Sequence, residues 1–119
     1  MTNEKFISEV ETLNNFFTIY CKDKHTEQNS CVRSLQYKNE NYDVEFHLCE
    51  ECNELINYSI KRLEECPHEI KPRCRKCPNP CYEKPQWKRL AKLMRYSGIQ
   101  LGVLKIKKLY KFSYNLFRN

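Results

Sequence analysis

The sequence predicts a mainly α-helical, metal-stapled domain of about four helices with one short β-hairpin and a cysteine-rich loop. Three observations lead to this prediction. Apolar residues recur at helical spacing in several segments of the 119-residue chain. One stretch instead alternates apolar and polar residues, as a strand does. The 8 cysteines include several with Cys-x2-Cys spacing, which supply ligands for metal ions that help hold so small a domain together.

The length of the chain fits one domain, covering residues 1–119. Residues 1–6 are amphipathic, without the apolar centre of a secretion signal, and no apolar run reaches membrane-spanning length. We therefore expect a cytoplasmic protein. In a reducing cytosol, Cys-x2-Cys motifs are more often metal sites than disulfides, so the alternative of a secreted disulfide framework is disfavoured.

Charge is distributed unevenly along the chain, whose net charge is +6. Residues 1–83 carry 11 Lys/Arg and 15 Asp/Glu, whereas residues 84–119 carry 10 Lys/Arg and no acidic residue. The basic segment 84–119 indicates a surface for nucleic acid, an anionic membrane or an acidic protein partner. A solvated helix face that docks on the acidic half of the same chain explains the charge equally well.

The first helix is predicted over residues 2–24, with Thr2 as its N-cap. An apolar stripe at helical spacing indicates a face packed in the core, and it consists of Phe6, Val10, Leu13, Phe17 and Tyr20, widened by Ile7 and Phe16. Near the end of this helix, Cys21 and His25 are four residues apart, so both side chains leave the same face one turn apart. That is the geometry of two metal ligands on a helix.

A hairpin is expected after the first helix. Residues 42–47 alternate apolar and polar side chains, which indicates a strand. Residues 38–41 would form the turn, with Leu35 and Tyr37 on the opposite strand. Cys31 has no partner at metal-ligand spacing, so we expect it to be a free thiol.

The motif Cys49-x2-Cys52 lies where this strand meets the next helix, as in many zinc knuckles. The helix is predicted over residues 50–65 and ends before Pro67, because the residue before a proline disfavours the helical region. Its apolar face is expected to consist of Leu55, Ile56, Ser59, Ile60 and Leu63.

The cysteine-rich loop, residues 66–81, holds four cysteines and four prolines. The prolines interrupt regular structure, and four thiols so close together suit a tetrahedral metal site or a cubane cluster. The spacing of Cys74, Cys77 and Cys81 is Cys-x2-Cys-x3-Cys, which differs by one residue from the Cys-x2-Cys-x2-Cys of bacterial ferredoxins.

Two basic helices are predicted at the C-terminus. One begins at Lys84, with Pro85 in its first turn, and Gly98 fits its C-terminal cap. The other covers residues 100–117 and is weakened by Gly102. Aromatic side chains that could stack on the bases of a nucleic acid are Trp87, Tyr96, Tyr110, Phe112 and Tyr114.

The candidate metal ligands number eight and divide into two sites of four. The simplest division gives a Cys3His site of Cys21, His25, Cys49 and Cys52 and an all-thiolate site of Cys66, Cys74, Cys77 and Cys81. The mixed set favours zinc, whereas the all-cysteine set suits zinc or a 4Fe–4S cluster. Both sets leave no position for water, which disfavours a catalytic metal. The alternatives are an exchange that moves Cys66 into the first set, or one site with the remaining thiols free.

Enzymatic chemistry has little support in the sequence. No carboxylate pair, nucleophile elbow or phosphate loop stands out, and two glycines cannot build a glycine-rich phosphate loop. His47 and His68 are candidate acids or bases, but an exposed side chain or a partner of a metal ligand explains each of them better. We therefore expect a protein that is not an enzyme.

Several motifs together resemble the bacterial nitrous-oxide-stimulated promoter family. They are Tyr20-Cys21…His25, Cys49-x2-Cys52-x2-Leu55-x2-Tyr58-x3-Arg62-Leu63-x2-Cys66-Pro67, Lys71-Pro72-x-Cys74-x2-Cys77-Pro78-x2-Cys81-Tyr82 and Met94-Arg95-Tyr96-Ser97-Gly98. The resemblance covers roughly residues 13–110. This chain departs from the family pattern at Pro80, where the family favours a histidine, and at Ile99-Gln100, where it favours Pro-Arg.

The resemblance implies a small cytoplasmic protein whose expression is tied to nitrosative stress. Nitric oxide attacks zinc thiolates and iron–sulfur clusters, and a structural site that loses its metal loosens the fold around it. We expect an accessory or regulatory protein with two zinc sites. The alternative is an iron–sulfur or zinc-thiolate sensor of nitric oxide that binds nucleic acid through residues 84–119.

Overall fold

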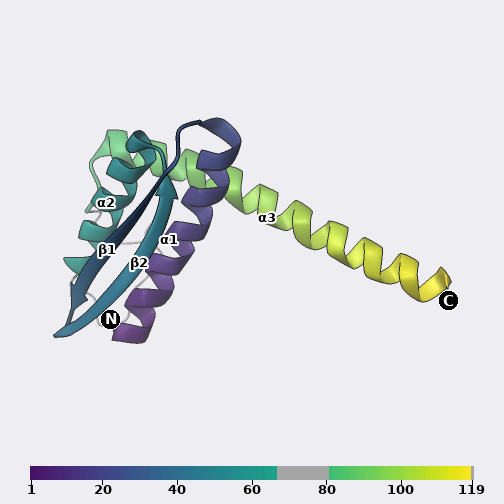
Figure 1. Ribbon diagram of the computed structural model, residues 1–119, viewed down its shortest axis with the longest axis horizontal. Coiled ribbons are helices and arrows are strands. Elements are labelled where there is room, and N and C mark those ends of the chain that lie inside the picture. The colour runs from purple at the N-terminus through teal and green to yellow at the C-terminus, as the bar shows by residue number, and fades with distance from the viewer. Residues whose placement is uncertain (67–80, 119) are drawn as a thin grey trace.

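The computed structural model describes residues 1–66 and 81–118. Its elements follow the order α1 (Asn3–Lys24), β1 (Asn29–Tyr37), β2 (Glu40–Leu48), α2 (Glu50–Glu64) and α3 (Lys84–Arg118). The hairpin, α1, α2 and the first part of α3 pack together, and the rest of α3 projects away from them (Figure 1). The described part of the chain is thus mainly helical with one antiparallel hairpin, as predicted.

α1 is the central element, because it packs against α2, α3 and β2. Thr2 caps it as predicted, with its side-chain oxygen accepting a hydrogen bond from the Lys5 amide at 3.1 Å. Four residues of the predicted stripe, Phe6, Val10, Leu13 and Phe17, are buried together with Cys21. Tyr20, the fifth residue of the predicted stripe, is only partly buried. At the start of the stripe, the Phe6 ring stacks on Tyr37 of β1 with centroids 4.2 Å apart. Burial of this face therefore fixes α1 against the hairpin.

β1 and β2 pair in antiparallel register, with Leu35 opposite Tyr42. Both strands have 9 residues, so the hairpin is longer than predicted. The turn is also tighter than the predicted 38–41, because Glu40 already pairs with Tyr37. Lys38 and Asn39 both have positive φ, 46° and 66°, which is the signature of a two-residue type I′ turn.

α2 buries its predicted face, comprising Leu55, Ile56, Ser59, Ile60 and Leu63, together with Cys52 from its first turn. On the hairpin, Leu35, Tyr37, Phe46 and Leu48 are buried. These side chains and those of the α1 face form one hydrophobic core. The core therefore fixes the end of α1 and the junction between β2 and α2 relative to each other.

α3 is one continuous helix of 35 residues, so the prediction of two helices separated at Gly98 was wrong. Gly98 has no positive φ, and a Cβ added to it would meet nothing within 4 Å. A glycine inside a helix costs only about 1 kcal/mol, which packing on either side overcomes. In α3, Leu90, Leu93 and Ser97 are buried at helical spacing. No helix of the described residues is long and apolar enough to span a membrane.

Gly98→Ala is expected to stabilise the protein by about 0.5–1 kcal/mol, because alanine has a higher helix propensity and the added methyl group meets no neighbour. Chemical denaturation of the variant and the parent measures this difference. Ile99→Ala, at the next position, is a suitable control because Ile99 is exposed. A loss of stability in Gly98→Ala would show that this glycine ends a helix after all.

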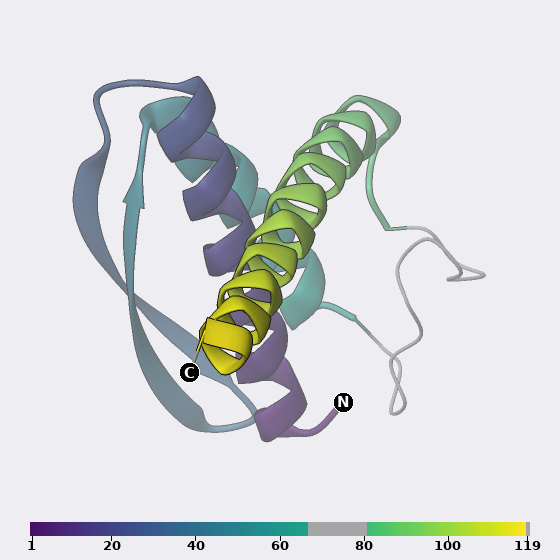
Figure 2. The same ribbon diagram turned by 90° about the vertical axis from the view of Figure 1, so that its right-hand side faces the viewer.

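Ser97 marks a close approach of α3 to α1. Its hydroxyl is buried and donates a hydrogen bond to the Phe16 carbonyl at 2.6 Å, even though that carbonyl belongs to the interior of α1. Figure 2 shows α3 running across α1, and the two helices are in contact. The first half of α3 is therefore docked on the helix that carries Cys21.

Candidate metal centre

The end of α1 and the start of α2 supply one group of candidate ligands. Cys21 lies in the last turn of α1, and His25 caps that helix, its amide donating to the Cys21 carbonyl at 2.9 Å. Cys49 is the N-cap of α2, and its sulfur accepts a hydrogen bond from the Cys52 amide at 3.5 Å. A cap of this kind folds the chain back on itself, which brings Cys49 and Cys52 together.

The four side chains converge on one point. Their ligand atoms, three Sγ and one imidazole nitrogen, all lie within 4.8 Å of one another. His25 Nδ1 is 3.4 Å from Cys49 Sγ and 3.3 Å from Cys52 Sγ. A tetrahedral zinc ion with ordinary bond lengths would separate sulfur from nitrogen by about 3.6 Å and two sulfurs by about 3.8 Å. The residues therefore fit a Cys3His metal ion with small adjustments.

Hydrogen bonds favour the thiolate form of Cys21. Its sulfur accepts from the Cys49 amide at 3.2 Å and from Gln28 Nε2 at 3.5 Å. Burial alone would raise the pKa of Cys21, but these bonds outweigh it and lower the pKa to about 7. Burial, together with the charge of Cys21, raises the pKa of Cys52 well above its ordinary value. A cation between them would relieve this repulsion and let both thiols ionise.

In the metal-free protein, the first thiol is expected to ionise near pH 7, as measured by the ultraviolet absorbance of the thiolate. The folded pKa of Cys21 lies below the ordinary 9.0, so its ionisation contributes stability above pH 9 that is lost as the pH falls to about 7. The midpoint near pH 7 should vanish in Cys21→Ser. A first midpoint close to pH 9 in the parent protein would contradict this assignment.

The sequence profile of the nitrous oxide-stimulated promoter family matches residues 4–109. The chain belongs to this family. The match includes all four side chains of the Cys3His group, and it extends further toward the N-terminus than the motifs that carry the resemblance. No curated protein and no solved structure matches the chain.

The other predicted ligands are not part of that group. Cys66 lies just after α2 and is partly buried against the core, and Cys81 is exposed before α3. Cys74, Cys77 and His68 lie outside the described residues. A second site therefore stays a prediction, and the group of four is complete without Cys66.

The remaining candidates have plain structural explanations. Cys31 is an exposed free thiol on β1, as predicted. His47 is exposed on β2, and its Nε2 atom lies 3.1 Å from a Glu45 carboxylate oxygen. Free thiols also occur at Cys21, Cys49, Cys52 and Cys66, so no disulfide links these four cysteines to one another or to Cys31.

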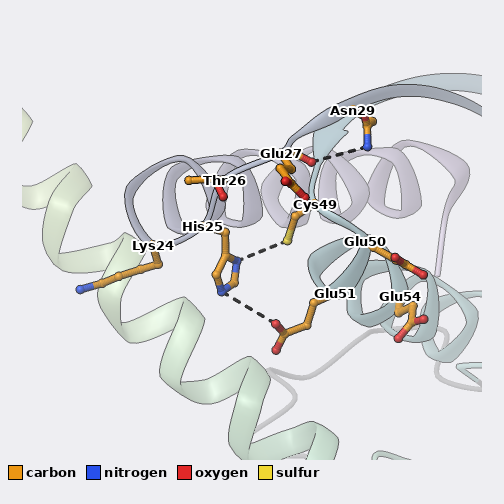
Figure 3. A pocket seen from close by; sticks show the side chains of 9 residues that line it. All are labelled: Lys24, His25, Thr26, Glu27, Asn29, Cys49, Glu50, Glu51 and Glu54. Carbon is orange, nitrogen blue, oxygen red and sulfur yellow. Dashed lines mark hydrogen bonds and ion pairs between the residues drawn. The ribbon is translucent and has the colours of Figure 1, made fainter.

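One side of the Cys3His group opens to a surface hollow. His25 and Cys49 lie in its wall, and Figure 3 shows that the other side chains around them include Glu27, Glu50, Glu51 and Glu54. The Glu51 carboxylate is 4.0 Å from His25 Nε2, on the opposite edge of the ring from the two thiols. The hollow therefore lies next to two of the four candidate ligands.

Two residues that contact the candidate ligands were missed in the sequence, and only one of them has a signal there. Gln28 donates to the Cys21 carbonyl and to the His25 carbonyl, each at 3.0 Å, and so closes the loop after α1. Its sequence context indicates only a loop. Glu51 is signalled by its position inside the Cys49-x2-Cys52 motif, because residues between two ligands stay close to the metal.

Proposed function

We propose that this family member is a small cytoplasmic zinc-binding protein of the nitrosative-stress response, accessory or regulatory rather than catalytic. The convergence of Cys21, His25, Cys49 and Cys52 carries the proposal. Three thiolates and one imidazole match the preference of zinc for sulfur and nitrogen ligands. The family name supplies the connection with nitrogen oxides.

The proposed zinc ion has a structural role. All four tetrahedral positions are taken by side chains, so no position remains for a reacting water molecule. The ion would join the end of α1 to the junction between β2 and α2, two points separated by the hairpin in the sequence. Metal binding then adds directly to the folding free energy, and reaction of the thiolates with nitric oxide would remove that contribution.

We also propose a second site at Cys66, Cys74, Cys77 and Cys81, holding zinc or a 4Fe–4S cluster. Contacts at the C-terminal end of the cysteine-rich loop support it. The Glu83 amide donates to the Tyr58 hydroxyl of α2 at 3.0 Å, and the Tyr82 ring packs edge-on against Tyr58 with centroids 5.5 Å apart. α2 therefore anchors the chain just after Cys81 and also ends next to Cys66.

Metal content and the visible spectrum of anaerobically purified protein test both sites. Two zinc ions per chain without visible colour would support two structural zinc sites. One zinc ion, retained in a Cys74→Ser/Cys77→Ser double variant, would restrict binding to the centre formed by α1 and α2. A brown protein would identify an iron–sulfur cluster, whereas a protein without metal would refute the proposed function.

A second candidate function is a nitric oxide sensor that binds nucleic acid. The observation that favours it is α3, which carries 10 basic and no acidic side chains and extends beyond the core. Binding to DNA or RNA should weaken steeply with salt, because each neutralised phosphate releases counterions. Replacing Lys105, Lys107 and Lys108 with glutamine should reduce the salt dependence. Absence of binding at low salt would exclude this function.

A further inference from the structure

Glu51 contacts both a metal-ligand candidate and α3. One of its carboxylate oxygens lies 4.0 Å from His25 Nε2, and the other lies 3.3 Å from an Arg89 guanidinium nitrogen. The three residues belong to three different parts of the fold: His25 follows α1, Glu51 belongs to α2, and Arg89 belongs to α3. A single carboxylate therefore links the candidate metal centre to the N-terminal part of α3, which we call the base of this helix.

An aromatic contact joins the same two regions independently. The Tyr20 ring packs edge-on against His25 and also against Tyr96 of α3, both with centroids 5.6 Å apart. The Tyr96 hydroxyl donates to Asp23 at 2.7 Å, and Lys24 Nζ lies 4.8 Å from the Tyr96 ring centre. The last turn of α1, which carries Cys21, is thus in contact with α3 through several side chains.

We propose that Glu51 is a positioning residue that couples metal binding to the docking of α3. This inference rests on the proposed zinc site. His25 faces the thiols with Nδ1, which leaves Nε2 directed toward Glu51. A carboxylate on this side of the ring makes the imidazole a stronger ligand, and it would hold the ring in orientation once the 4.0 Å separation closes to a hydrogen bond. Arg89 in turn holds the carboxylate, so α3 contributes to the metal site without touching it.

The coupling acts in both directions. If docking of α3 strengthens metal binding, metal binding must strengthen docking by the same factor. The positive charge of the metal strengthens the attraction between the imidazole and the Glu51 carboxylate. Glu51 is then held in place, where it pairs with Arg89. Loss of the metal would then loosen the base of the helix that carries 10 of the 21 Lys/Arg residues of this chain. Binding or loss of the metal would in this way determine how firmly the basic helix α3 is held against the core.

Zinc affinity of the full chain, measured by competition with a chelator, tests the positioning role. Glu51→Gln keeps the shape of the side chain and should weaken zinc binding several-fold, approaching tenfold, because 4.0 Å is longer than a hydrogen bond. Arg89→Gln should also weaken binding, and the double variant should lose less than the product of the two effects. Glu54→Gln, in the same hollow, is the matched control and should bind like the parent.

The side chains of Glu51 and Arg89 are 64% and 45% exposed, so their ion pair contributes little to folding and the variants should fold. Unchanged zinc affinity in Glu51→Gln would overturn the inference while leaving the zinc site intact. A parent protein that binds no zinc would instead overturn the proposed function, and the inference with it.

Hydrogen exchange of residues 84–102 tests the other direction of the coupling. Zinc should slow exchange at the base of α3 in the parent protein, and this protection should be smaller in Glu51→Gln. Equal exchange with and without zinc, in a protein that demonstrably binds it, would overturn the inference. The Glu54→Gln variant should show the same protection as the parent.

Discussion

Cys52→Ser is expected to abolish zinc binding at the proposed centre and to destabilise the fold strongly. Cys52 is only 3% exposed, and serine offers a poor ligand for zinc in place of a thiolate. With free zinc at about 1,000 times its Kd, loss of binding removes about 4 kcal/mol of stabilisation. Metal analysis after dialysis and chemical denaturation in the presence of zinc measure the two effects.

Cys31→Ser is the matched control, because it makes the same chemical change at an exposed thiol of β1. It should retain zinc and change the unfolding free energy by no more than about 0.5 kcal/mol. If Cys52→Ser kept its full zinc content and its unfolding midpoint, the Cys3His group would neither bind zinc nor stabilise the fold through it.

Phe17→Ala should destabilise the hydrophobic core severely, costing about 3–5 kcal/mol. Phe17 is fully buried and lies one turn before Cys21 on the same face of α1. Its removal leaves a cavity beside the segment that positions a ligand, so zinc affinity should fall as well. Denaturation in excess chelator isolates the packing cost from the contribution of the metal.

The adjacent residue supplies the control for this substitution. Phe16 is only partly buried, because it lies at the edge of the stripe. Phe16→Ala should therefore cost clearly less than Phe17→Ala, although both remove the same ring. Equal losses would mean that the buried face of α1 has been assigned incorrectly.

The sequence was sufficient where structure depends on local periodicity. The spacing of Phe6, Val10, Leu13 and Phe17 places them on one side of any α-helix, and the structure buries all four. Cys21 and His25 are also brought together, although His25 is the C-cap of α1 and has extended backbone angles. The helix around Leu55 and Ile60 was equally predictable, since its apolar residues fall on one face and Pro67 prevents it from continuing.

The sequence was insufficient where distant elements meet. Gly98 looked like the end of a helix, because local propensity takes no account of how Leu93 and Ser97 pack in the folded chain. The contact of Glu51 with Arg89 spans 38 residues and depends on the angle at which α3 crosses the core. No spacing rule encodes such an angle, so this link between the candidate metal centre and α3 is seen only in the folded chain.

The continuity of α3 makes it a lever. Ser97 is buried against α1, and the helix continues from there to Arg118 over about 32 Å, at the usual rise of about 1.5 Å per residue. A tilt of about 10° at Ser97 would move the far end by about 5–6 Å, because a helix without a break transmits rotation along its whole length. A shift of a side chain at Arg89 or Tyr96 would thus be magnified at the C-terminus.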